Sequence, residues 1–382
     1  MAKILFVFGT RPEAIKMAPL INAMKNDKLF TCRVCVTGQH RKMLDQVLDF
    51  FEISPDYDLQ LMKENQTLAD ITADVVKGVD SIIRHQFMPD YVIVQGDTTT
   101  AMAGAMAAFY SKVKVIHIEA GLRSHEKYSP YPEEINRVLI GKIADLHFAP
   151  TQKAVDHLLS DGVPAEDIWN VGNTVIDALL AGLEKIKKQD TSVFTTHFNF
   201  TDGSKRIILV TGHRRESFGE PFENICRALK AIAQRNPDVE IIYPVHLNPK
   251  VREPVDRLLR NDPRIHLIEP LDYAQLIWLL NMATLVITDS GGIQEEAPAL
   301  GKPVLVMREV TERMEGVEAG TAKLVGTNYE NIVSECQALL SDAEKYNRMA
   351  QSVNPYGDGT SSIQIVSILK NILSSKHILL PQ

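Results

Sequence analysis

Short hydrophobic runs recur along the chain, and each ends in a cluster of polar residues or glycine. The runs are continuous rather than alternating, and helical patterns such as those at 225–233 and 332–340 lie between them. Continuous strand hydrophobicity with intervening helices indicates parallel sheets covered on both faces. The runs lie at 4–8, 33–36, 91–94, 113–118 and 146–149, and then at 207–210, 239–243, 265–268, 285–288 and 304–307.

The series of runs restarts after residue 205, which predicts two doubly wound α/β domains. The polar segment 187–205 has the composition of a linker, Asn-Pro-Tyr-Gly-Asp-Gly at 354–359 is a second break, and the periodic segment 363–373 predicts a terminal helix. Ligands of open α/β sheets bind at the carboxyl ends of the strands, where the polar clusters fall. Two such domains facing each other would form a cleft lined from both halves.

Composition narrows the class of protein. The 382 residues include 48 acidic and 41 basic side chains, and the net charge of −7 argues against nucleic acid as the main partner. No run is long enough for a membrane span, and the run at 4–8 is too short for the core of a signal peptide. Four cysteines indicate a reducing cytoplasm. Cys32 and Cys35 form a CxxC within a strand-like run, where the thiols would face opposite sides, so we interpret them as structural.

The stretch 285–296 carries the clearest chemistry. Leu-Val-Ile-Thr-Asp-Ser-Gly-Gly-Ile-Gln-Glu-Glu predicts a buried strand that leads through small residues into a helix. The first N–H groups of a helix lack partners within it and lie at the positive end of its dipole, so they bind phosphate. Glu295 and Glu296 would repel a bare phosphate, but a carboxylate accepts from both hydroxyls of a ribose. The stretch therefore predicts a nucleotide site; the alternative is a tight turn before a capped helix.

Three carboxylates follow strands or begin helices in the first half of the chain. Asp97 is either a helix N-cap or a carboxylate directed into the cleft. Glu119 ends a strand, where Arg123 could pair with it, and Glu133 begins a helix, where its charge favours the dipole. Together they form a candidate acid–base group opposite a phosphate-binding domain.

Basic residues follow the first strand of each predicted domain. Arg11 and Lys16 bring positive charge to the first, and His213, with two arginines behind it, suits a diphosphate in the second. His213 could also protonate a leaving group, or the loop could be ion-paired with Glu216. There is no dinucleotide fingerprint, P-loop, metal-ligand spacing or nucleophile elbow, so NAD is disfavoured and no metal is assigned.

With these motifs the chain resembles the non-hydrolysing UDP-N-acetylglucosamine 2-epimerases of bacteria over nearly its full length. The matching motifs are GTRPEAIKMAP at 9–19, GDTTT at 96–100, EAGLR at 119–123, PEE at 132–134, GHRRESFG at 212–219, YPVHLNP at 243–249, DSGGIQEEAP at 289–298 and NPYGDG at 354–359. The resemblance implies an α/β fold of glycosyltransferase-B type, with two Rossmann-like, doubly wound parallel-sheet domains facing a central cleft.

The resemblance also implies how the chain divides. Residues 1–173 would form the N-terminal Rossmann-like domain with the acid–base groups, and a C-terminal helix at 360–375 would pack back on it. Residues 174–205 would be an interdomain helix and linker. Residues 206–354 would form the C-terminal Rossmann-like domain that binds UDP.

By this resemblance the chain would interconvert UDP-N-acetylglucosamine (UDP-GlcNAc) and UDP-N-acetylmannosamine (UDP-ManNAc) without metal or other cofactor. UDP would be eliminated to give a 2-acetamidoglucal and then added back. Asp97, Glu119 and Glu133 would do the acid–base work, assisted by Lys16 and His213 near the departing phosphate. The diphosphate would be bound by Arg11, His246, Ser290, Gly291, Gly292 and Arg313. Glu296 would bind the ribose, and residues near Leu271 and Leu276 would bind the uracil.

Two departures from the family pattern stand out. Leucine occupies position 276, where an aromatic residue often stacks on the base, and Gln95 replaces a histidine that many members have before Gly-Asp. We otherwise expect a cytoplasmic homodimer, without nucleic-acid or membrane partners, that serves the synthesis of envelope polysaccharide. The alternatives are an epimerase for a related UDP-HexNAc, a glycosyltransferase of the same architecture, a hydrolysing epimerase, and a non-catalytic nucleotide-sugar sensor.

Overall fold

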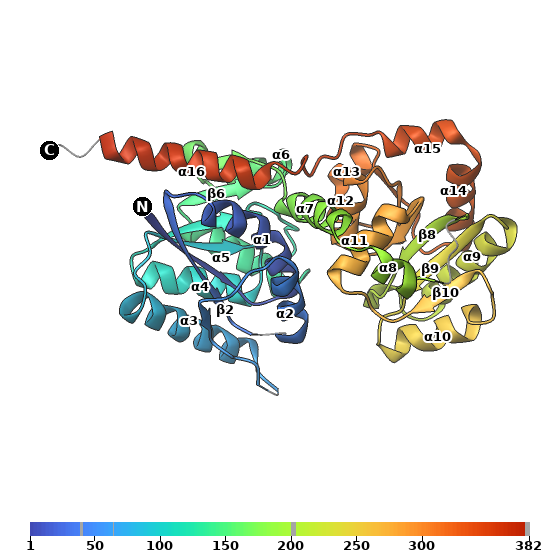
Figure 1. Ribbon diagram of the computed structural model, residues 1–382, viewed down its shortest axis with the longest axis horizontal. Helices are drawn as coiled ribbons and strands as arrows, with labels where there is room; N and C mark the ends of the chain where they lie inside the picture. The colour runs from blue at the N-terminus through green and yellow to red at the C-terminus, as the bar shows by residue number, and fades with distance from the viewer. Residues whose placement is uncertain (39–40, 64, 200–203, 379–382) are drawn as a thin grey trace. The chain divides into compact units, whose positions relative to one another are not determined.

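The structure is a computed structural model that describes residues 1–38, 41–63, 65–199 and 204–378. The chain divides into two compact units, which we call unit 1 (Met1–Ala178 and Tyr356–Gln382) and unit 2 (Leu179–Pro355). Each unit is built on one parallel sheet with helices packed around it (Figure 1). The predicted fold class, two Rossmann-like parallel-sheet domains, is confirmed.

The sheet of unit 1 has the strand order β3-β2-β1-β4-β5-β6-β7. Ile4 pairs with Cys32 on one side and with Tyr91 on the other, so the chain reverses its winding direction between β1 and β4. Ligands of doubly wound sheets bind at this switch point. The strands are β1 (Ala2–Phe8), β2 (Phe30–Val36), β3 (Tyr57–Asp58), β4 (Tyr91–Gln95), β5 (Lys114–Ile118), β6 (Leu146–Ala149) and β7 (Ile168–Asn170).

Helices enclose this sheet. On one face α3, α4 and α5 form the core with the inner strands, and α4 is rich in alanine. An added Cβ at Gly104 of α4 would lie 3.0 Å from Val7 Cγ1, so small residues allow this helix to lie close to the strands. The helix α16 contacts α1. The helices are α1 (Arg11–Lys25), α2 (Arg41–Phe50), α3 (Leu68–His85), α4 (Thr99–Tyr110), α5 (Glu133–Ile143), α6 (Gln152–Ser160), η1 (Ala165–Asp167) and α16 (Ser361–Ile378).

Unit 2 repeats the doubly wound plan with the strand order β10-β9-β8-β11-β12-β13. A core of aliphatic residues fills one face of the sheet under α9, α10 and α14. The strands are β8 (Arg206–Thr211), β9 (Val239–Pro244), β10 (Ile265–Ile268), β11 (Leu285–Thr288), β12 (Val304–Val306) and β13 (Ala322–Leu324). The helices are α9 (Glu220–Arg235), α10 (Pro249–Leu259), α11 (Tyr273–Met282), α12 (Gly291–Ala299), α13 (Met314–Glu318), α14 (Tyr329–Ser341) and α15 (Ala343–Ala350), with a 3₁₀ turn η2 (Arg215–Ser217).

The segment predicted as a linker contains ordered structure. The helix α7 (Thr174–Lys188) crosses the boundary between the units, and α8 (Ser192–His197) follows it. Phe194 and Phe198 stack on Trp278 of α11, with ring centroids 6.0 and 5.0 Å away. The polar composition of this stretch gave no sign of these two aromatic contacts, which lie within unit 2; its residues 200–203 lie outside the described part. Among the described residues, no helix combines the length and hydropathy that crossing a bilayer requires.

Candidate active site

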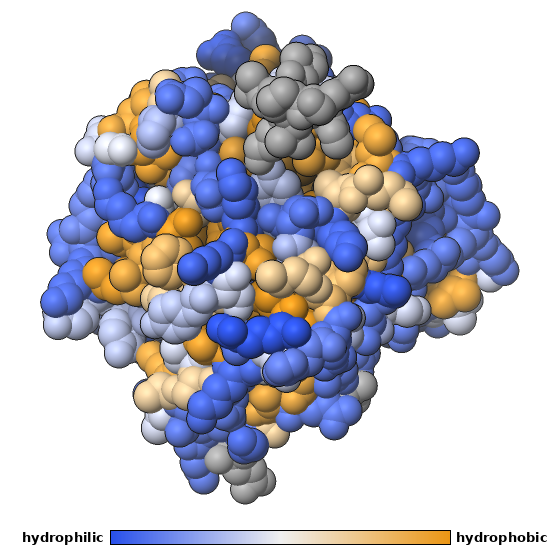
Figure 2. Space-filling view, turned by 90° about the vertical axis from the view of Figure 1, so that its left-hand side faces the viewer, coloured by the Kyte–Doolittle hydropathy of each residue, from blue (hydrophilic) through white to orange (hydrophobic). Residues whose placement is uncertain are grey.

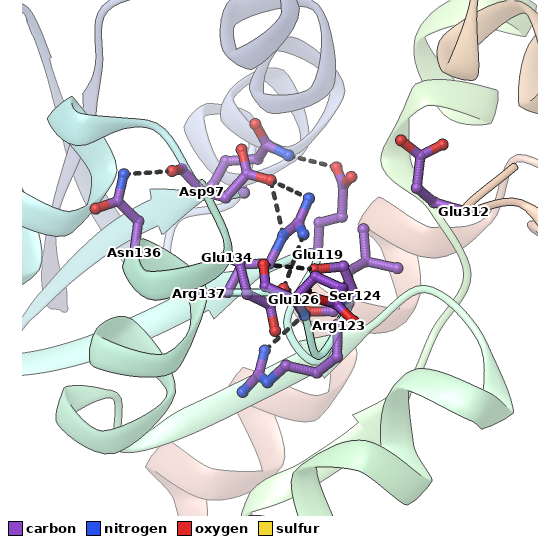
Figure 3. A network of polar contacts seen from close by, with 12 residues as sticks. Asp97, Glu119, Arg123, Ser124, Glu126, Glu134, Asn136, Arg137 and Glu312 are labelled. Atoms are coloured by element: carbon purple, nitrogen blue, oxygen red, sulfur yellow. Dashed lines mark hydrogen bonds and ion pairs between the residues drawn. The ribbon is translucent and has the colours of Figure 1, made fainter. Parts of the chain in front are cut away.

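Asp97 lies just beyond the end of β4. Gly96, with φ of +68°, makes the turn out of the strand, and Thr98 is the N-cap of α4, its Oγ1 accepting from the N–H of Ala101 at 3.0 Å. Asp97 is therefore not the cap, and the N-cap alternative for it is wrong. Its carboxylate is instead held by Arg137 of α5 (Figure 3).

The first turns of α5 organise the loops around Asp97. Asn136 donates to the backbone oxygen of Asp97 at 2.8 Å, and the Arg137 NH1 group lies 3.2 Å from Glu134. Glu134 also accepts from the N–H groups of Ser124 and His125. Burial raises the pKa of Glu134, but these backbone and guanidinium donors outweigh it, and the net shift is downward. The same helix therefore fixes the turn after β4 and the loop after β5.

Glu119 follows β5, the strand next to β4 in the sheet. Its carboxylate is buried and contacts both Lys16 Nζ, an ion pair, and Gln95 Nε2. Arg123, expected as a possible partner, binds Asp161 instead, with Nε and NH2 3.0 and 2.7 Å away. Glu119 has φ of +62°, a left-handed conformation that costs a residue with a side chain about 1 kcal/mol or more. The backbone is held in this strained state at the residue whose carboxylate contacts Lys16 and Gln95.

Glu133 begins α5, the helix that holds Asp97. Its Oε2 atom is buried and has no hydrogen-bond partner among the described residues. Of the three predicted carboxylates, two are thus engaged by basic or amide donors, and the third offers an unpaired oxygen. All three belong to unit 1, at the carboxyl ends of β4 and β5 and at the start of α5.

A buried carboxylate that the sequence analysis missed connects two of these loops. Glu13 of α1 accepts from the N–H groups of Gly9 and Thr10 at 3.1 and 2.8 Å, and from the Thr98 hydroxyl at 2.7 Å. Burial raises the pKa of Glu13, and these donors oppose the rise. Thr10 and Glu13 form a capping box, a spacing that was readable in the sequence. Arg11 and Lys16 lie on this helix.

In unit 2, the neighbouring strands β9, β8 and β11 lead to His246, His213 and Asp289. Asp289, after β11, accepts from the backbone N–H groups of His213 and Arg214 at 2.7 and 2.8 Å. The His213 and His246 rings stack with centroids 5.0 Å apart and planes 8° from parallel. Burial, and then the neighbouring His213, lowers the pKa of His246. Glu216, expected as an ion-pair partner within the His213 loop, pairs with Arg308 at 2.7 Å.

The predicted helix start after β11 is present. Ser290 is the N-cap of α12, and Gly291 and Gly292 are its first residues. An added Cβ at Gly291 would lie 3.4 Å from Arg313 Cζ, so a guanidinium lies beside the positive end of this helix. Arg313 Nε donates to Glu295 at 2.7 Å, which fixes the guanidinium there. A helix N-terminus next to an arginine is an arrangement that binds phosphate.

One turn further along α12, Glu296 is buried and accepts a hydrogen bond from the Tyr273 hydroxyl at 2.9 Å. Tyr273 begins α11, so Leu271 and Leu276 flank the residue that contacts Glu296. Both leucines are partly exposed. The predicted ribose residue thus contacts the helix start that both predicted uracil residues flank in the sequence. Within the described part of the chain, no three His, Cys, Asp or Glu side chains are grouped as a metal ion would require.

Comparisons with known proteins agree with one another. The family model described as UDP-N-acetylglucosamine 2-epimerase matches residues 22–370. The UDP-N-acetylglucosamine 2-epimerase of Escherichia coli (strain K12) is 53% identical over 371 residues, covering 97% of this chain and 98% of that protein. The crystal structure of the Neisseria meningitidis UDP-GlcNAc 2-epimerase bound to UDP-GlcNAc is 47% identical, with a TM-score of 0.90 over 97% of this chain and 100% of that one. A Staphylococcus aureus structure with UDP is 48% identical, covers 98% and 97% of the two chains, and has a TM-score of 0.85.

Proposed function

This chain belongs to the UDP-N-acetylglucosamine 2-epimerase family, and from that membership we infer that it is an isomerase that inverts C2 of UDP-GlcNAc to give UDP-ManNAc. The observation that carries this inference is the near full-length match at about half identity to enzymes of that name. The substrate is UDP-GlcNAc, the ligand named for the similar structure from N. meningitidis. The related UDP-HexNAc epimerase is the nearest competing activity.

We propose that the reaction runs by elimination and re-addition. The C2–H bond of the sugar is not next to a carbonyl, so a base alone cannot remove its proton easily. When the bond from C1 to the phosphate oxygen breaks, its electron pair leaves with UDP. The base takes the C2 proton, and the C–H electron pair becomes the C1=C2 double bond of a 2-acetamidoglucal. UDP then adds back to C1 while a proton reaches C2 on the opposite face.

Unit 1 would supply the proton-transfer groups. Asp97, Glu119 and Glu133 are the three candidates, and their environments differ. Arg137 holds Asp97, while Lys16 and Gln95 hold Glu119. Glu133 differs in having a buried oxygen without a hydrogen-bond partner among the described residues. Differences of this kind let similar carboxylates take different roles in one reaction.

Unit 2 would bind the nucleotide. The start of α12 at Ser290, Gly291 and Gly292, with Arg313 beside it, would hold the diphosphate. Its other proposed ligands are His246 and, from unit 1, Arg11, while His213 and Lys16 would assist near the departing phosphate. Glu296 would accept from the ribose hydroxyls, since the Tyr273 hydroxyl already orients its carboxylate. Leu271 and Leu276 would contact uracil through apolar surface.

Incubation with UDP-GlcNAc in heavy water, without acceptor or NAD, tests the function directly. We expect deuterium at C2 and a mixture of the two UDP-sugars, read by NMR. Absence of exchange would favour a transferase or a sensor, and accumulation of free ManNAc would favour a hydrolysing enzyme. Comparing kcat/KM for UDP-GlcNAc with that for other UDP-HexNAc derivatives decides between the epimerase activities.

We also propose that two copies of the chain associate through α4 and α5, which pack against each other. Phe109 and Tyr110 at the end of α4 are 59% and 60% exposed, and Ile135 and Leu139 lie one turn apart on α5 and are also exposed. Figure 2 shows hydrophobic residues among hydrophilic ones on one face of the molecule. Clustered exposed apolar side chains mark protein interfaces. Sedimentation velocity should give a dimer that Phe109→Glu converts to monomer; a monomeric wild type would disprove the pairing.

The cellular compartment and the pathway are further proposals. All four cysteines are free thiols, which agrees with a reducing cytoplasm. Supply of UDP-ManNAc for envelope polysaccharide is the role that the family resemblance implies. Fractionation of the source cells, followed by detection of the protein, checks the compartment.

A further inference from the structure

Asp289 uses its two carboxylate oxygens differently. The residue is 3% exposed and follows β11, next to β8, whose end leads to His213. Its Oδ2 atom accepts both backbone N–H groups at the start of that loop, from His213 and Arg214. Anchoring the loop therefore occupies only one oxygen.

The other oxygen faces the imidazole. Asp289 Oδ1 is buried without a hydrogen-bond partner among the described residues, and it lies 3.7 Å from His213 Nδ1. An unpaired buried carboxylate oxygen is costly, so its position next to a ring nitrogen calls for an explanation. On the other side, His246 stacks on the His213 ring and limits its rotation. The His213 side chain is 46% exposed, so the ring remains accessible to a ligand.

We propose that Asp289 is a positioning residue for His213 and forms an Asp–His pair with it. The Nδ1–H group would donate to Oδ1 once the ring closes the remaining gap, which fixes the tautomer and directs Nε2 toward the ligand. This assignment rests on the proposed function, in which His213 lies at the departing diphosphate. As the C1–O bond breaks, its electron pair stays on the phosphate oxygen, and the Nε2 proton of the imidazolium moves to that oxygen; it returns to Nε2 when UDP adds back. The carboxylate stabilises the imidazolium and keeps its own charge.

The variant Asp289→Asn tests separately the two roles of Asp289, anchoring the loop and pairing with His213. The amide oxygen can still accept the two backbone N–H groups, whereas the amide NH₂ cannot accept from Nδ1–H. We expect kcat to fall about 10- to 100-fold or more, because the imidazole loses the carboxylate that orients it, with KM and the Kd for UDP changed less than about threefold. Asp342→Asn is the matched control in the same unit. Asp342 also accepts two backbone N–H groups, at 3.0 and 3.1 Å, but is only partly buried and has no role in the proposed site.

A double-mutant cycle decides whether Asp289 acts through His213. In the His213→Asn background, Asp289→Asn should cost less than about threefold more in kcat, because the pair is already broken. An unchanged kcat for the folded single variant, or an equal loss in both backgrounds, overturns the assignment.

A measurement on the wild-type protein covers the case in which Asp289→Asn does not fold. NMR of ¹⁵N-labelled protein reports which ring nitrogen of His213 carries the proton, and the His213 signal is assigned by its loss in His213→Gln. In the neutral ring the proton should be on Nδ1. Protonation on Nε2 would overturn the pair. If wild-type protein shows this tautomer but incorporates no deuterium from heavy water, the proposed function has failed while the Asp–His contact stands.

Discussion

Arg137 binds a single oxygen of Asp97. Its Nε and NH2 atoms lie 2.9 and 2.6 Å from Oδ2, which leaves Oδ1 outside the ion pair. The two residues are 40 positions apart and come from α5 and from the loop after β4. The guanidinium is 10% exposed and the carboxylate 25%, so the pair is largely shielded from solvent. Arg137 therefore sets the direction of this carboxylate.

Asp97→Asn removes the charge but keeps the size of the side chain. We expect deuterium exchange at C2 to fall by about 10²- to 10⁴-fold, the usual worth of an acid–base group. Binding of UDP, measured by calorimetry, should change little because the proposed nucleotide contacts lie mainly in unit 2. Loss of UDP binding together with the fold would show instead that Asp97 is structural.

Arg137→Lys tests the positioning of Asp97. Lysine carries the charge but cannot present two nitrogens to one carboxylate oxygen, so Asp97 should rotate more freely. We expect kcat to fall about tenfold or more with little change in the Kd for UDP. Arg123→Lys is the matched control: Arg123 binds Asp161 through the same two nitrogens but does not contact Asp97. Equal losses of kcat in the two variants would contradict the specific role of Arg137.

Gly121 and Gly162 form a second matched pair, with φ of +88° and +81°. An added Cβ at Gly121 would lie 2.2 Å from the backbone oxygen of Ala154, whereas none of the described atoms lies within 4 Å at Gly162. We expect Gly121→Ala to lower the free energy of unfolding by at least about 3 kcal/mol and Gly162→Ala by about 1 kcal/mol. Urea unfolding followed by Trp169 fluorescence, in a Trp278→Phe background, reports on unit 1; similar costs for both variants would count against the close contact.

Two buried histidines predict acid sensitivity of unit 1. Burial lowers the pKa of His117 to about 3 and that of His147 to about 4. Between these values and the unfolded pKa of about 6.5, the unfolded chain binds protons that the native state does not, so stability decreases as the pH falls. Above about pH 6.5 the neutral histidines do not lower the free energy of unfolding. At pH 5 each histidine has lowered it by about 2 kcal/mol.

The variant His117→Gln isolates this effect. Its amide can still donate to the Gly96 carbonyl oxygen, which lies 2.7 Å from His117 Nε2 in the wild type. Glu13 and Asp177, whose carboxyl pKa values burial raises, shift stability in the opposite direction, so the comparison must be made with the wild type. The free energy of unfolding should depend less steeply on pH between 7 and 5 in the variant. An unchanged slope would mean that the His117 ring is not held neutral.

The sequence by itself determined the architecture, because strands buried on both faces must be hydrophobic throughout, and the runs are continuous for that reason. It also located the helix start at Ser290, since small residues after a buried strand and before a helical segment have few other uses. The resemblance to the epimerase family rested on collinear motifs and agrees with the family model over residues 22–370.

Only the tertiary structure decided which side chains meet. Glu119 lies four residues from Arg123 in the sequence, yet its partner is Lys16, 103 positions away. Glu13 reaches Thr98, and Asp289 reaches His213, across similar separations. The reason is the strand order, which places β1 beside β4 and β8 beside β11 and so brings the ends of distant segments to one edge. The local sequence pattern determines which residues form each strand. Only the pairing of the strands determines which residues lie next to the end of each one.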